Sequence, residues 1–163
     1  WVVQVTVGRN FSGRLGAGRL LKPRFELRML LKTSVRKKVT RFPGVPTIYT
    51  AINNSHETKK YDLSSINLCI SGGAPLPVEV KENFEKLTGC ILVEGYGLTE
   101  SSPVAAVNPL DENRRAGSIG RPVPGTKVRF VDIEDRKTEV AQGEKGELLI
   151  HGQPGLQGYW KRE

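Results

Sequence analysis

The stretch "EGYGLTE" brings together residue types that suit the binding of a phosphorylated ligand. Gly95 and Gly97 free the backbone on both sides of Tyr96, so that its ring can lie against a planar base. Such stacking contributes about 1–3 kcal/mol per base in other nucleotide sites. Thr99 can donate a hydroxyl hydrogen bond to a phosphate oxygen. Glu100 would repel that phosphate unless Mg²⁺ lay between them, since Mg²⁺ is typically held by one or two carboxylates together with phosphates.

Two further glycine-rich stretches could form part of a site. "SGGAPLP" ends a strand-like run and begins a helix-like one, where Gly72 and Gly73 would let a flat ligand approach the backbone and unpaired N–H groups begin the helix. An ordinary strand-to-helix turn would have the same sequence, so both interpretations stay open. "GELLIHGQPGLQGYW" favours a structural β-hairpin with aromatic packing. Neither His56 nor His151 has a partner at metal-ligand spacing, and no serine has the G-x-S-x-G spacing of a nucleophile elbow.

Hydrophobic spacing predicts the elements that must position these stretches. The expected elements are a helix over 25–38, a strand over 39–42 closed by Pro43-Gly44, a helix from Pro46 to about Asn53, a strand over 66–71, a helix from Pro77 to Gly89 and a strand over 90–95. The apolar stripe of the last helix is Val80, Phe84 and Leu87.

The order strand, helix, strand, helix, strand predicts parallel strands joined by right-handed crossovers. Parallel order brings Pro43-Gly44, Gly72-Gly73 and Gly95-Tyr96-Gly97 to one edge, where ligands of open α/β sheets bind. After about Asn108, short β-rich runs alternate with Gly and Pro. We therefore expect an α/β fold: a parallel βαβαβ portion of a larger sheet, followed by a small, mainly antiparallel β subdomain. The expected divisions are a basic segment over 1–24, an α/β portion over 25–107 and a β-rich portion over 108–163.

The composition allows one core or a share in a larger one, because the 163 residues are 37% hydrophobic. The chain begins at Trp1 and stops at Glu163 with no obvious terminal element, so we expect an internal piece of a longer protein. No apolar run approaches the roughly 18 residues of a membrane span, and no signal-peptide pattern opens the chain. Cys69 and Cys90 lie in strand-like runs, which favours buried free thiols in a reduced, cytoplasmic location, with a disulfide as the alternative.

The net charge of +8 is concentrated near the N-terminus, where residues 1–41 hold eleven Lys/Arg and the single acid Glu26. Such a block could bind nucleic acid or an anionic membrane surface. However, arginines recur there at intervals of five, which forms no clean helical or strand face, and few aromatic residues lie between them. A solvated segment is the favoured interpretation, so no nucleic-acid partner is expected, while peripheral membrane association stays open.

Five stretches in this order carry a family resemblance: "FPGVPTIY", "SGGAPLP", "EGYGLTE", "GSIGRPVPGT" and "GELLIHG…GYW". Together they resemble the adenylate-forming acyl-CoA synthetases, and "FPGVPTIYTAINN" is most similar to the medium- and long-chain fatty acid–CoA ligases. The resemblance runs from about residue 25 to the end, and residues 1–24 fit it poorly. It implies an internal fragment of the large N-terminal domain of such an enzyme.

The resemblance implies an activity and a set of site residues. The family activates a carboxylate with Mg-ATP to an acyl-adenylate and then transfers the acyl group to coenzyme A, so a fatty acid, ATP and CoA would be the substrates. Thr99 and Glu100 would be catalytic, with Thr99 at the α-phosphate and Glu100 as the Mg²⁺ ligand, and Tyr96 would lie against the adenine. The positions implied to bind the nucleotide, with Gly72 to Ala74 also bordering the acyl group, are Gly72, Gly73, Ala74, Gly95, Tyr96, Gly97 and Thr99.

The family pattern also contains parts that these residues lack. They are a phosphate-binding loop upstream, a ribose-binding aspartate after "GYW" and a C-terminal domain with a catalytic lysine. We therefore expect the isolated chain not to complete adenylation. Two alternatives stay open: an adenylation domain for another acid, of the aryl-CoA ligase or peptide-synthetase type, and a non-catalytic remnant whose basic N-terminus binds polyanions.

Overall fold

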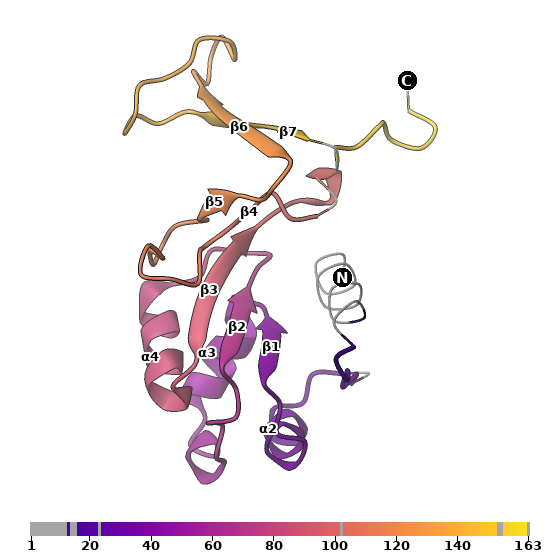
Figure 1. The fold of residues 1–163 in the computed structure, drawn as a ribbon, viewed down its shortest axis with the longest axis vertical. Coiled ribbons are helices and arrows are strands. Elements are labelled where there is room, and N and C mark those ends of the chain that lie inside the picture. Colours follow the sequence, from indigo (N-terminus) through magenta and orange to yellow (C-terminus); the bar gives the residue numbers. More distant parts are fainter. Residues whose placement is uncertain (1–12, 14–15, 23, 102, 153–154, 163) are drawn as a thin grey trace.

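The protein is described by a computed structural model that covers residues 13, 16–22, 24–101, 103–152 and 155–162. A five-stranded sheet with its helices forms one part of the molecule, and a two-stranded sheet continues from its far end (Figure 1). The five-stranded sheet has the order β1 (Arg41–Gly44), β2 (Leu68–Ser71), β3 (Ile91–Tyr96), β4 (Ala106–Val107) and β5 (Arg121–Pro122).

The first three strands are parallel, as the sequence predicts. Leu68 of β2 lies opposite Arg41 of β1 on one side and opposite Ile91 of β3 on the other. β4 and β5 then pair antiparallel and continue the same sheet, with Tyr96 opposite Ala106. The sheet is therefore mixed, and its direction changes at the end of β3.

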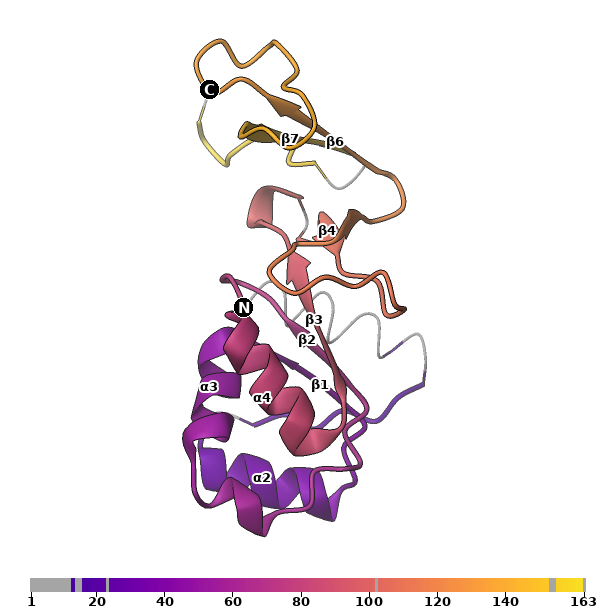
Figure 2. The same ribbon diagram turned by 90° about the vertical axis from the view of Figure 1, so that its left-hand side faces the viewer.

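Three helices pack against the parallel strands: α2 (Leu27–Arg36), α3 (Pro46–Asn54) and α4 (Val78–Thr88). Figure 2 shows α3 and α4 side by side on one face of β1–β3, with α2 near the end of the strands away from β4 and β5. Proline at the first position of α3 has no N–H to leave unpaired, and its fixed φ suits a helix start. α4 ends at Gly89, whose φ of 73° is the left-handed conformation that glycine adopts without strain. The expected helices are confirmed.

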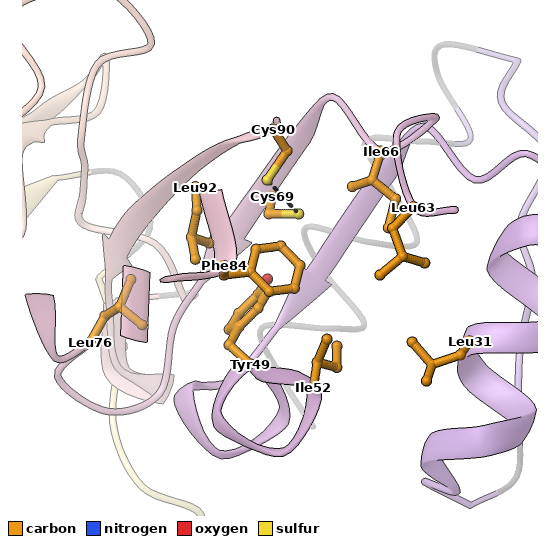
Figure 3. Packing of buried hydrophobic residues seen from close by; sticks show 10 residues of the cluster. All are labelled: Leu31, Tyr49, Ile52, Leu63, Ile66, Cys69, Leu76, Phe84, Cys90 and Leu92. Atoms are coloured by element: carbon orange, nitrogen blue, oxygen red, sulfur yellow. Dashed lines mark hydrogen bonds between the residues drawn. The ribbon is translucent and has the colours of Figure 1, made fainter. Parts of the chain in front are cut away.

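The core lies between the sheet and its helices, and Figure 3 shows ten of its residues. The Tyr49 and Phe84 rings meet edge to face with centroids 4.9 Å apart, and both side chains are fully buried. The Tyr49 hydroxyl lies 2.9 Å from the Phe42 carbonyl oxygen and 3.1 Å from that of Ile70, so it has a partner despite its burial. Burial raises the pKa of Tyr49 well above its usual value.

The two cysteines are buried free thiols, as predicted. Their Sγ atoms lie 3.8 Å apart in the core (Figure 3). The hydrogen bond with Cys90, together with burial, raises the pKa of Cys69. Cys69 therefore stays protonated near neutral pH and packs as a small apolar side chain.

One expected core position is wrong. Leu87 belongs to the apolar stripe of α4 by spacing, yet its side chain is 38% exposed, whereas Phe84 on the same stripe is fully buried. Helical spacing gives the direction of a side chain but not how far the covering layer extends, and Leu87 lies near the end of α4.

Replacing Phe84 by alanine is expected to lower the free energy of unfolding by about 3–5 kcal/mol, because the change removes a buried ring and leaves a cavity. Leu87→Ala on the same helix is the matched control, and we expect it to cost less than about 1 kcal/mol because Leu87 is partly exposed. Urea unfolding of the chain would measure both changes. Equal shifts of the two midpoints would contradict the assignment of Phe84 to the core.

The small antiparallel sheet predicted after about Asn108 is present as β6 (Thr126–Val131) and β7 (Glu147–Gly152). A charged segment joins the two strands. Arg136 in this segment forms an exposed ion pair, 3.1 Å long, with Glu147 at the start of β7. Within the described ranges, no helix is long and apolar enough to cross a membrane.

Candidate functional site

The carboxyl ends of the three parallel strands lie next to one another at one edge of the sheet. Gly44, Ser71 and Glu94 are direct neighbours in the strand register, and the Gly72 N–H donates to the Gly44 carbonyl oxygen at 3.2 Å. The glycine-containing corners therefore meet at one edge, as the sequence predicts. We call this edge the ledge; it comprises Gly44, residues 71–74 and residues 94–97.

Gly44 has a structural reason to be glycine. A Cβ built at this position would lie 3.0 Å from the Tyr49 hydroxyl and from two ring carbons of the same side chain. The absent side chain therefore makes room for the buried phenol of α3, so the core alone is enough to explain this glycine.

The second corner leads from β2 into α4. Gly72 is buried, whereas Gly73 and Ala74 are exposed, and the φ of 84° at Gly73 favours glycine. The Leu76 N–H donates to Oε1 of Glu94 at 3.3 Å, which ties the corner to β3. Burial raises the pKa of Glu94. Sequence reasoning assigned Glu94 no role, because its partner lies 18 residues away.

Ser71 lies beneath this corner with its side chain fully buried. Within the part of the chain that the structure describes, the Ser71 Oγ has no hydrogen-bond partner. A buried hydroxyl without a partner costs about 1–3 kcal/mol. The ledge therefore includes a polar atom whose hydrogen-bonding capacity is unused.

Gly95 and Gly97 differ in what surrounds them. A Cβ at Gly95 would meet Ile70 Cγ2 at 3.5 Å, which is ordinary contact, whereas a Cβ at Gly97 would overlap the carbonyl group of Pro103. Gly97 thus permits a close approach of two backbone segments. Tyr96 between them is half-buried, and because side chains alternate along a strand it lies on the same face of β3 as Glu94.

Thr99 and Glu100 follow on a short 3₁₀ turn, η3 (Thr99–Ser101). The Thr99 side chain is exposed, so its hydroxyl is accessible to a ligand. Ser101 is buried, its Oγ donates to the Leu98 carbonyl oxygen at 3.0 Å, and the Leu98 N–H lies 3.3 Å from the same Oγ. These contacts fix the backbone of the turn. Sequence reasoning did not single out Ser101, although it directly follows the motif.

Glu100 has a partner that the sequence did not reveal. The Tyr159 hydroxyl donates to Oε1 of Glu100 at 2.7 Å, and the Leu156 N–H donates to the Glu100 carbonyl oxygen at 2.8 Å. The hydrogen bond between the Tyr159 hydroxyl and the Glu100 carboxylate lowers the pKa of Glu100 and raises the pKa of Tyr159. In Figure 1 the end of β7, which leads into this segment, lies beside η3.

The expectation of aromatic packing after β7 is wrong. Tyr159 is 58% exposed and Trp160 is 88% exposed. The phenol of Tyr159 serves as a hydrogen-bond donor to an acid 59 residues earlier in the chain. Only the place of "GYW" in the motif order gave any sign that this segment matters.

The side chains around Glu100 fit one particular kind of metal site. Among the residues that the structure covers, no group of three or more His, Cys, Asp or Glu side chains could hold a metal ion by itself. Mg²⁺ needs no such group, since it commonly takes one or two carboxylates and completes its shell with phosphate oxygens and water. A single carboxylate with one oxygen fixed by Tyr159 is compatible with that arrangement.

Comparison with known proteins gives the family. The sequence profile of the family described as AMP-binding enzyme matches residues 1–160. The chain belongs to this family. The match includes residues 1–24 and therefore begins earlier than the motifs indicate.

The names of two curated relatives give different acids as their substrates. The long-chain-fatty-acid–CoA ligase of Bacillus subtilis strain 168 is 44% identical over 161 residues, which are 99% of this chain and 29% of that enzyme. The 4-coumarate–CoA ligase 1 of Arabidopsis thaliana is 38% identical over 153 residues, 90% of this chain and 27% of the relative. This chain therefore spans less than a third of the length of either relative.

A solved structure confirms the fold of this chain. ATP-bound MatB from Rhodopseudomonas palustris superposes with a TM-score of 0.87 at 28% identity, covering 99% of this chain and 31% of the MatB chain. The parallel strands, their helices and the small antiparallel sheet thus form part of the fold of the MatB chain.

Proposed function

We propose that this chain supplies the nucleotide-binding ledge of a long-chain fatty acid–CoA ligase. Such an enzyme joins a fatty acid to the α-phosphate of Mg-ATP and then to coenzyme A. The observation that carries the proposal is Glu100, which is held by Tyr159 on a turn directly after β3, with Thr99 beside it. The 44% identity to the Bacillus subtilis ligase supports the fatty acid as the substrate.

The chemistry explains why these side chains are useful. A carboxylate oxygen of the fatty acid attacks the α-phosphorus, an O–P bond forms, and the bond to the leaving pyrophosphate breaks. The two reactants are both anions, so they must be held in line and their repulsion reduced. A bound Mg²⁺ supplies positive charge at the phosphates.

Residues of the ledge and of the turn η3 that follows it have distinct roles in this proposal. The exposed Thr99 hydroxyl donates to an α-phosphate oxygen, and Glu100 is the protein ligand of the metal. Tyr96 lies against the adenine ring. The backbone of Gly72, Gly73 and Ala74 borders the adenine and the acyl group, where the lack of bulky side chains allows close approach.

The 163-residue chain by itself is expected to show no ATP–pyrophosphate exchange with any fatty acid. It spans 29% of the length of the Bacillus subtilis enzyme, and the family resemblance places the phosphate-binding loop and the catalytic lysine in other segments. The measurement is exchange of labelled pyrophosphate into ATP with palmitate and Mg²⁺ present. Exchange above the background of a Glu100→Ala control would show that these residues are sufficient.

A pair of chimeras tests the proposed substrate. In one, this chain replaces the matching segment of the Bacillus subtilis ligase; in the other, it replaces that of the Arabidopsis 4-coumarate–CoA ligase. We expect exchange with palmitate in the first and little exchange with 4-coumarate in the second, because the proposed substrate is a fatty acid, as the 44% identity to the Bacillus subtilis ligase supports. Activity in the aryl host alone would favour an aryl-CoA ligase, and activity in neither would contradict the proposed function.

A further inference from the structure

The segment after β7 holds Glu100 by two separate hydrogen bonds. One runs from the Leu156 N–H to the Glu100 carbonyl oxygen at 2.8 Å, and the other from the Tyr159 hydroxyl to Oε1 at 2.7 Å. The first restrains the main chain of η3, and the second restrains only the carboxylate. The two hydrogen bonds can therefore be removed separately, because one holds the Glu100 carbonyl oxygen and the other holds Oε1 of its side chain.

The main chain of η3 is already secured without Tyr159. The Oγ of buried Ser101 hydrogen-bonds to the Leu98 main chain within the turn. The Leu156 N–H, from a later segment, donates to the Glu100 carbonyl oxygen. A glutamate side chain, however, has three rotatable bonds and would sample many positions around a fixed backbone. The Tyr159 hydroxyl limits this freedom and leaves Oε2 of Glu100 available to a further ligand.

We propose that Tyr159 is a positioning residue that orients the Glu100 carboxylate, so that Oε2 meets the metal of a bound Mg-nucleotide. This inference rests on the proposed function and extends it to a residue on a different segment of the chain. Metal-binding carboxylates are themselves generally hydrogen-bonded, and loss of such a partner typically weakens metal affinity 10–100-fold.

Metal binding tests the proposal without relying on turnover. The chain is carried in the Bacillus subtilis ligase in place of the matching segment, and Mn²⁺ binding in the presence of a non-hydrolysable ATP analogue is followed by electron paramagnetic resonance. Tyr159→Phe removes one hydroxyl and is expected to raise the dissociation constant of Mn²⁺ at least tenfold. Trp160→Phe is the matched control; its side chain is 88% exposed, and we expect a change of less than twofold.

A double-mutant cycle shows whether Tyr159 acts through Glu100. In a Glu100→Gln background, Tyr159→Phe is expected to have no further effect on Mn²⁺ affinity. An unchanged affinity in the single variant, or an equal loss in both backgrounds, would overturn the proposal. Equal melting temperatures of Tyr159→Phe and the parent chimera would confirm that a structural defect is not the cause.

The contact itself can be read in the 163-residue chain. The chain has four tyrosines, so labelling with 3-fluorotyrosine gives four ¹⁹F signals, and Tyr159→Phe identifies the one from position 159. We expect Glu100→Ala to move this signal and Glu144→Ala to leave it in place, since Glu144 bonds to Ala141 instead. If the signal moved but the chimera bound no nucleotide, the proposed function would be refuted and the contact between Tyr159 and Glu100 would stand. A signal that did not move would refute that contact.

Discussion

Glu100→Ala in the Bacillus subtilis chimera is expected to reduce ATP–pyrophosphate exchange by about 10²–10³-fold, the usual effect of removing one group that stabilises charge in a transition state. The residual exchange should no longer respond to added Mg²⁺, because the variant lacks the carboxylate that Tyr159 orients. The measurement is the initial rate of exchange as a function of Mg²⁺ concentration at saturating palmitate.

Glu82→Ala provides the control for this result. Glu82 is an exposed acid on α4, so its removal changes the net charge equally without touching η3. We expect the control to keep its rate and its Mg²⁺ dependence. If Glu100→Ala behaved in the same way as Glu82→Ala, the metal-binding role of Glu100 would be wrong, although the fold and the family would be unaffected.

Gly97→Ala is expected to have the largest effect on stability of any single methyl addition in the motif, lowering the free energy of unfolding by about 3 kcal/mol or more. The new Cβ would overlap the carbonyl group of Pro103, and both partners are backbone atoms that cannot turn aside as a flexible side chain can. Relief would require residue 97 and the segment before β4 to separate. Urea unfolding followed by circular dichroism would give the change.

Gly95→Ala is the matched comparison, since it adds the same methyl group two residues earlier in the same stretch. The nearest atom to its Cβ would be Ile70 Cγ2 at an ordinary 3.5 Å, and alanine in a strand loses less entropy on folding than glycine. We expect a change of less than about 1 kcal/mol in either direction. Similar losses for both variants would show that the space at residue 97 is not the reason for its glycine.

Much of the fold could be predicted because its signals are local. The helices α3 and α4 have regular apolar spacing and distinct ends in Pro46 and Gly89, and the observed bounds follow these marks. The parallel order of β1 to β3 follows from the helices between them, since each connection must cross over to return in the same direction. The meeting of the three glycine corners at one edge is a consequence of that order.

The features that sequence reasoning missed depend on contacts between distant segments. The bond from Tyr159 to Glu100 joins residues 59 apart, and no periodicity relates the two positions. The sequence pattern places Gly44 at a ligand-facing corner, yet a Cβ there would lie in tight contact with the buried phenol of Tyr49, at 3.0 Å. A glycine at a turn indicates that the backbone can adopt unusual angles or approach another group closely. Which atoms lie beside that glycine is known only from the fold.

The long separation between Glu100 and Tyr159 has a consequence for protein synthesis. The pairing of β1, β2 and β3 involves no residue beyond Tyr96, so these three parallel strands can join before the later segments have been made. Glu100 gains its hydrogen-bond donor Tyr159 only after 59 more residues have been made. At a ribosomal rate of about 5–20 residues per second this delay is roughly 3–12 s. During that interval the nascent protein contains β1 to β3 and Glu100 but lacks Tyr159, whose hydroxyl orients the Glu100 carboxylate.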